Sequence, residues 1–198
     1  EVNTILSHIF HHDYWYFPVF ATWFSTGLRN SELIGLTWDC IEFDQARIKV
    51  TKTLKRIDRV ATVRRWSGTK NGQHRYVPMS KMLVEVLTSH QCFMTERDLY
   101  HPQGLLFLTK RTKSNLYDAL LERVWKRTLE SLNLKPRKLY SQRHTFLSHA
   151  LAAGNSPADV AQIAGHRLQE LLSTYAHPTG NFKNIEWQHD SYEPIVID

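Results

Sequence analysis

Apolar residues recur at helical spacing in the first part of the chain. Within residues 5–10 they lie three and four positions apart, which predicts a helix with one buried face. An aromatic-rich stretch over 14–24 predicts a second, mostly buried helix that ends at Gly27. Asn30 is a plausible N-cap for a short third helix, with Glu32 in its first turn, where the helix dipole favours a carboxylate.

The hydrophobic period changes from helix to strand after Trp38. Short runs over 40–43, 48–51 and 76–78 suit β-strands, and the last follows an Asn-Gly turn at 71–72. These three runs predict a small antiparallel sheet.

After residue 80 the pattern is largely helical again. Glycines at 154 and 165 stand where two of the predicted helices should end, and a last helix is expected over 168–175. Four serines precede or open the expected helices and are predicted as caps: Ser80, Ser114, Ser141 and Ser156. The fold class predicted is therefore α+β, mainly helical, with a small antiparallel three-stranded sheet at one edge.

The predicted organisation is one domain over 1–179 followed by a tail over 180–198. No linker or internal repeat divides the longer part. In the tail, Gly180 and Asn181 break the helical pattern. The apolar run over 195–197 could then form a strand that docks in cis or on a neighbouring molecule.

Positive charge is concentrated in one segment. The chain has 25 Lys and Arg against 19 Asp and Glu, a net charge of +6. Residues 52–75 alone have a net charge of about +7, because this segment contains eight basic residues and one acidic residue, Asp58. A strand and loop along a phosphate backbone would have this composition, and so would an exposed hairpin kept soluble by its charge. The basic residues are Lys52, Lys55, Arg56, Arg59, Arg64, Arg65, Lys70 and Arg75.

Composition also indicates in which cellular compartment the protein works. Two cysteines favour a reducing environment, and no apolar run approaches the length of a membrane span, so we expect a cytoplasmic protein with no membrane contact. The cluster of His11, His12 and Asp13 has atoms suited to a metal. Adjacent helical positions face different directions, however, so we expect no metal site there.

Two residues near the C-terminal end require an explanation. Arg143 falls on the predicted buried stripe of its helix, where a guanidinium needs a phosphate, a carboxylate or an internal salt bridge. Tyr175 fits the core-facing pattern of the last helix, so packing alone would account for it if it stood by itself.

Taken together, five ordered blocks resemble the tyrosine recombinase, or phage integrase, family. Arg29 and Glu32 lie in the first block, 26–33, and Lys70 in the second, 69–78. The third block is 140–146, where the family usually has histidine and this chain has Tyr140. The fourth ends at His166, and Tyr175 follows nine positions later.

The resemblance implies DNA strand cleavage and rejoining through a 3′-phosphotyrosine, without metal or cofactor. Arg29 and Arg143 would clamp the non-bridging oxygens, Lys70 would protonate the departing 5′-oxygen, and His166 would bind the phosphate. The catalytic set implied is Arg29, Lys70, Tyr140, Arg143, His166 and Tyr175, with Glu32 in support. Tyr140 would contact the phosphate or buttress Tyr175.

The family also implies partners. These are double-stranded DNA bound by the basic segment, a tetramer on DNA that is monomeric or weakly associated when free, and a nucleoid-associated location. We expect the family's separate N-terminal DNA-clamping domain to be absent from this chain. A type IB topoisomerase would share the chemistry. A non-catalytic helix-turn-helix protein would explain the predicted helices over 156–175 but not Arg29 or Lys70.

Overall fold

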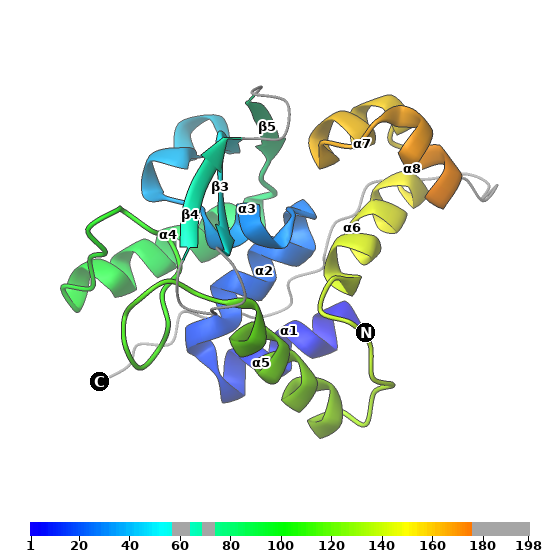
Figure 1. The fold of residues 1–198 in the computed structure, drawn as a ribbon. Coiled ribbons are helices and arrows are strands. Elements are labelled where there is room, and N and C mark those ends of the chain that lie inside the picture. Colours follow the sequence, from blue (N-terminus) through cyan, green and yellow to red (C-terminus); the bar gives the residue numbers. More distant parts are fainter. Residues whose placement is uncertain (57–63, 69–73, 176–198) are drawn as a thin grey trace.

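The computed structural model describes residues 1–56, 64–68 and 74–175 of the 198-residue chain (Figure 1). Lys70, Arg59 and the tail over 180–198 lie outside the described residues. The described part is mainly helical with small antiparallel sheets, as the sequence predicts.

The N-terminal helices build one side of the main core. Their buried residues are almost all apolar, and Phe20, Trp23 and Leu28 are completely buried. Gly27 ends the second helix at φ +58°, a left-handed conformation that glycine adopts without strain. The elements are α1 (Val2–His12), a 3-10 turn (Tyr14–Tyr16), α2 (Phe17–Thr26) and α3 (Asn30–Ile34).

The predicted three-stranded sheet is present, with the order β1-β2-β5 and antiparallel pairing. Ile48 faces Val77 across the central pair, and both side chains are fully buried. The strands are β1 (Ile41–Glu42), β2 (Arg47–Val50) and β5 (Arg75–Pro78). The basic segment adds a second, two-stranded sheet, in which β3 (Lys52–Arg56) pairs with β4 (Arg64–Gly68).

Two longer helices complete the main core. Ser80 caps α4 (Lys81–Glu96), because its hydroxyl accepts the Leu83 N–H at 3.2 Å. The predicted cap at Ser114 is wrong, since α5 (Asp118–Ser131) begins four residues later. The Ser114 hydroxyl lies instead in a cluster with the hydroxyls of Thr109 and Thr112, at 3.2 and 2.7 Å.

The last three helices form a smaller lobe beside the main core, at the right of Figure 1. They are α6 (Ser141–Ala152), α7 (Pro157–Ala164) and α8 (Leu168–Tyr175). Ser156 caps α7 as predicted, whereas Ser141 is the first residue of α6 rather than its cap. Their own core contains Leu147, Ala150, Val160, Ala161, Ala164 and Leu171.

The lobe is joined to the main core by contacts of α6 with α2 and of α7 with β5. The candidate site lies at this junction. Within the described ranges, no helix is long and apolar enough to cross a membrane.

Candidate active site

Three consecutive carbonyls at the end of α7 each accept a hydrogen bond from a different arginine. The Ile163 carbonyl binds Arg75 Nε at 2.7 Å, and the Ala164 carbonyl binds Arg143 Nη2 at 2.7 Å. The Gly165 carbonyl accepts from Arg29 Nη2. These arginines are 29, 75 and 143 in sequence, so a single helix end gathers three distant parts of the chain.

The helix end itself explains this gathering. The last carbonyls of a helix have no intrahelical partner and lie at the negative end of its dipole, which favours cations. Gly165 turns the chain out of the helix at φ +65°. A Cβ at this position would lie 2.9 Å from Arg29 Nη1 and 3.2 Å from two atoms of the Arg75 guanidinium. Glycine therefore supplies both the turn and the space for the arginines.

Glu32 is the anionic centre of the cluster. Its side chain is 2% exposed, and its carboxylate accepts the Arg29 N–H at 2.8 Å and Arg29 Nη1 at 3.1 Å. Arg75 donates to both carboxylate oxygens, at 2.9 and 2.7 Å. Burial raises the pKa of the Glu32 carboxyl, but the hydrogen bonds and charges of Arg75 and Arg29 outweigh it and hold the pKa below its usual value. Glu32 thus stays ionised and holds the Arg29 guanidinium through these hydrogen bonds.

Arg143 is completely buried, as its place on the predicted stripe indicates. Its partners are carbonyls: Nη1 donates to Gly27, at the end of α2, and Nη2 to Ala164. Among the described residues, these bonds and no salt bridge hold the guanidinium in place. Burial lowers the pKa of Arg143, as do the charges of Arg29 and Arg75, yet a guanidinium remains protonated in proteins. Its Nε is buried without a partner in the described part of the chain.

His166 follows the glycine turn directly. Burial lowers the pKa of its imidazole to about 4, and the charges of Arg143, Arg29 and Arg75 act in the same direction. The ring is therefore neutral near pH 7 and able to donate one hydrogen bond. Its Nδ1 is buried with no partner among the described residues.

Tyr175 ends α8 beside the start of α6. Its hydroxyl is hydrogen-bonded to Nδ1 of His144, and the two ring centroids are 5.7 Å apart. The Tyr140 ring also stands edge-on to His144, with the ring centroids 5.2 Å apart and the planes at 78°. From its position beside Arg143 in the sequence, His144 is expected to be a structural histidine bonded to the main chain, and the structure places it against Tyr175 instead. The sequence signal for His144 was the four-residue spacing from Tyr140, which places both side chains on one face of a helix.

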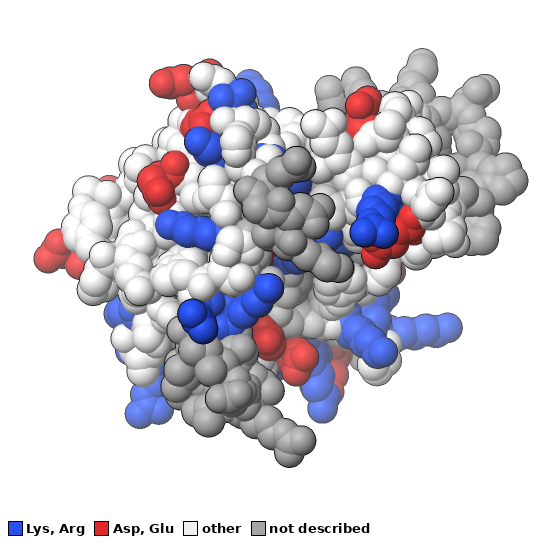
Figure 2. Space-filling view, turned by 45° about the horizontal axis from the view of Figure 1, so that its top comes forward, with Lys and Arg blue, Asp and Glu red and all other residues white. Residues whose placement is uncertain are grey.

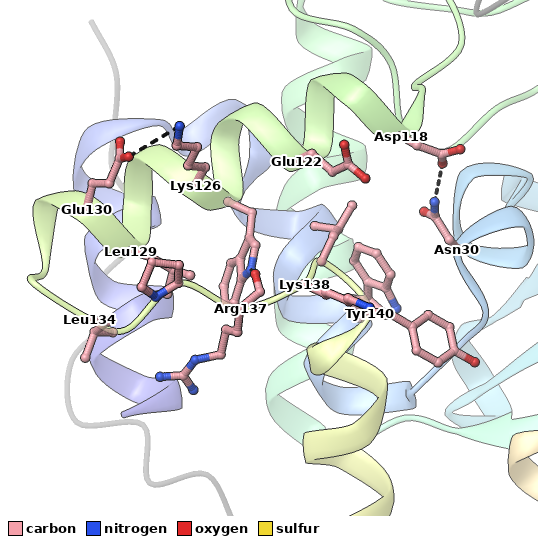
Figure 3. Close-up of a pocket in the computed structure, with 14 residues that line it drawn as sticks. Asn30, Asp118, Glu122, Lys126, Leu129, Glu130, Leu134, Arg137, Lys138 and Tyr140 are labelled. Carbon is pink, nitrogen blue, oxygen red and sulfur yellow. Dashed lines mark hydrogen bonds and ion pairs between the residues drawn. The ribbon is translucent and has the colours of Figure 1, made fainter.

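Two hollows flank Tyr140. The smaller, of about 310 Å³, is lined by residues including Arg29, Lys55 and Tyr140, and so places part of the basic sheet beside the site. The larger, of about 880 Å³, lies between α5 and the segment that leads to α6. Figure 3 shows Tyr140 and Asn30 at one end of it, with Asn30 bonded to Asp118.

The expected DNA contacts divide into two groups. Lys55 and Arg65 are exposed on paired strands, and Lys52 lies over the Trp66 ring at 4.8 Å from its centroid. Arg75 requires a correction: its side chain is only 12% exposed and turns inward to Glu32. In Figure 2, Lys and Arg side chains run along the middle of one face, beside the lobe of α6–α8.

In the cluster of His11, His12 and Asp13, the aspartate forms ion pairs. Its carboxylate pairs with the Arg127 guanidinium, and its Oδ1 lies 3.7 Å from Lys110 Nζ. In the described residues, no group of three or more His, Cys, Asp or Glu side chains is arranged to hold a metal ion.

A mainly helical domain of this topology, with Arg29 and Arg143 gathered at the end of α7, His166 directly after it and Tyr175 at the end of the neighbouring α8, is a tyrosine recombinase catalytic domain in its fold. The model of the phage integrase family matches residues 1–181, and the chain belongs to that family.

Sequence relatives agree with this assignment. A XerC-like tyrosine recombinase of Caldanaerobacter subterraneus subsp. tengcongensis is 27% identical, over 80% of this chain and 44% of the relative. XerC of Shewanella oneidensis is 22% identical, over 89% of this chain and 51% of the relative. The chain therefore spans about half the length of the curated relatives it matches.

Solved structures agree as well. The Tn1549 transposon integrase in complex with a circular intermediate DNA is 25% identical, with a TM-score of 0.76, over 89% of this chain and 60% of that one. The XerA recombinase superposes with a TM-score of 0.72 at 18% identity, over 89% of this chain and 58% of that one. At that identity the likeness shows the fold alone.

Proposed function

We propose that this chain cuts and rejoins double-stranded DNA at specific sites through a covalent 3′-phosphotyrosine on Tyr175. One observation carries the proposal. Arg29 and Arg143 donate to adjacent carbonyls at the end of α7, which brings two guanidinium groups from distant parts of the chain beside His166. Fixed cations at one point suit the charge that grows on a phosphate during substitution.

In this mechanism the Tyr175 oxygen attacks phosphorus and the 5′-oxygen leaves. Arg29 and Arg143 bind the non-bridging oxygens. The buried Nε of Arg143, which has no hydrogen-bond partner among the described residues, is one donor for this. Neutral His166 adds a hydrogen bond. Lys70 protonates the departing 5′-oxygen, a role that rests on the resemblance because Lys70 lies outside the described residues.

DNA as the substrate is supported by the basic sheet and by the named relatives. Lys55 lines the same hollow as Arg29, so a phosphate backbone that follows β3 would lead into the site. The Tn1549 integrase, which shares the fold at 25% identity, is in complex with DNA. The two XerC-type relatives carry the name tyrosine recombinase.

Larger assemblies belong to the proposal too. We infer that the chain acts as the catalytic part of a longer recombinase, binds DNA weakly by itself, and assembles as a tetramer on DNA. Exchange of the tail over 180–198 between neighbours would hold such a tetramer. Deleting 195–198 should then weaken synapsis, and unchanged synapsis would contradict the exchange.

The test is covalent capture. The substrates are duplexes with a randomised centre and a nick a few nucleotides to the 3′ side of it. Cleavage releases the short fragment that carries the free 5′-hydroxyl. Without that fragment rejoining fails, and the covalent adduct accumulates. Wild type should give a protease-sensitive protein–DNA adduct, and Tyr175→Phe none. DNA binding without any adduct would favour a non-catalytic helix-turn-helix protein. Plasmid relaxation without recombinant product would favour a topoisomerase.

A further inference from the structure

Three aromatic rings form a row across the α6–α8 contact. Tyr140 stands edge-on to His144 at 5.2 Å, and His144 lies against Tyr175 at 5.7 Å. Within this row the His144 Nδ1 and the Tyr175 hydroxyl are hydrogen-bonded. The imidazole therefore touches the atom that the proposed function makes the nucleophile.

The environment of Tyr175 calls for a proton acceptor. Burial raises the pKa of its phenol, Arg143 counteracts part of that rise, and Tyr140 adds to it. A phenol held protonated is a weak nucleophile until a neighbouring base removes its proton. The family position that usually holds histidine is Tyr140 here, and a phenol is a poor proton acceptor near neutral pH.

The other histidine beside the site is unsuited to this task. His166 is surrounded by Arg29, Arg75 and Arg143, which together with burial lower its pKa to about 4. An imidazole with so low a pKa is a weak base. His144, by contrast, is exposed, and its Nδ1 is already hydrogen-bonded to the Tyr175 hydroxyl.

We propose that His144 is the general base of strand cleavage, with the Tyr140 ring positioning its imidazole. This rests on the proposed function of Tyr175. As the Tyr175 oxygen bonds to phosphorus, its proton moves to His144 Nδ1, and the bond from phosphorus to the 5′-oxygen breaks. That oxygen takes a proton from the general acid. In rejoining, the 5′-hydroxyl attacks phosphorus and gives its proton to the deprotonated general acid, and the imidazolium returns its proton to the departing tyrosine.

Two substitutions separate proton transfer from positioning. His144→Ala removes the base, and His144→Gln keeps a hydrogen-bond acceptor that takes no proton at neutral pH. Both should slow single-turnover adduct formation about 100-fold, within the usual contribution of a general base. His149→Ala, five positions along the same helix on another face, is the matched control and should cleave like wild type. Equal DNA affinity of all three would show that the fold is intact.

A modified substrate identifies the side of the reaction on which His144 acts. A duplex with sulfur in place of the bridging 5′-oxygen has a leaving group that departs without a proton. It should rescue a variant that lacks the general acid but leave His144→Ala about 100-fold slower than wild type. Rescue of His144→Ala, or wild-type cleavage by His144→Gln, would overturn the proposal. Absence of any adduct from wild type would instead overturn the proposed function.

Discussion

Arg75 and Glu32 form a bidentate pair beneath the site, with both Nη atoms donating to the two carboxylate oxygens at 2.9 and 2.7 Å. The third contact of Arg75, to the Ile163 carbonyl, ties this pair to α7. The pair therefore links α3, β5 and the small lobe. A residue that composition assigns to the DNA surface holds the site together instead.

Arg75→Ala should lower the free energy of unfolding by about 3 kcal/mol, because it leaves the Glu32 carboxylate buried without its main partner. Arg65→Ala removes the same charge from an exposed strand position and should change it by less than about 0.5 kcal/mol. Urea unfolding of both variants measures the difference. If Arg75→Ala instead kept wild-type stability and bound DNA more weakly, Arg75 would be a DNA-contacting residue.

Gly165→Ala should reduce the rate of DNA cleavage at least about tenfold, because the added methyl group would displace the Arg29 guanidinium. A loss of about 1.4 kcal/mol of transition-state stabilisation lowers a rate tenfold. The added Cβ would lie 2.9 Å from Arg29 Nη1. Gly104→Ala is matched, because Gly104 has φ +66° and a Cβ added there would meet no atom of the described residues within 4 Å. Both variants carry a backbone strain of about 1–2 kcal/mol. Equal cleavage by the two would show that the space beside Arg29 is unimportant.

Lys55→Ala and Arg65→Ala should each weaken DNA binding at all sequences and reduce the salt slope by about one. The reason is that each removes one phosphate contact from the two-stranded sheet. Titration at several salt concentrations measures the slope. Arg97→Ala, at the end of α4 over the Phe93 ring, removes the same charge elsewhere and should leave the slope unchanged. An equal loss in all three variants would indicate a general charge effect.

Acid should destabilise the fold through His90. This ring is 6% exposed, its Nε2 lies 2.9 Å from the Leu106 carbonyl, and burial lowers its pKa from 6.5 to about 4. Between these values the unfolded state binds a proton that the folded state does not. The free energy of unfolding should therefore fall as pH decreases from 6.5 to 4, by up to about 1.4 kcal/mol per unit. His166, whose pKa is also lowered to about 4, adds a contribution of the same sign, so His90→Gln should reduce the slope in urea melts without abolishing it. An unchanged slope would rule His90 out.

The sequence predicted the elements well where the signals are local. Glycine at the ends of α2 and α7 and serine at the starts of α4 and α7 act within one helical turn, so they are readable without a fold. Ser114 failed as a cap because two nearby threonine hydroxyls compete for it. That competition arises from a loop conformation that composition does not specify.

For the candidate site, the sequence named residues but not the contacts between them. Arg75 was misassigned because the basic segment was counted as a whole, although alternation along β5 places Arg75 on the same side as the buried Val77. His144 was interpreted as structural because its contact with Tyr175 depends on how α8 packs on α6. The four-residue spacing from Tyr140 indicates that His144 shares a face with Tyr140, but it does not report the packing of α8.

Covalent attachment of Tyr175 to DNA can be tested directly. Trapped adduct can be digested with protease and nuclease, and the peptide that retains a nucleotide can be sequenced by mass spectrometry. The account predicts phosphate on Tyr175, at the end of α8. Attachment to Tyr140, an exposed tyrosine next to the same histidine, or to any other residue would contradict it.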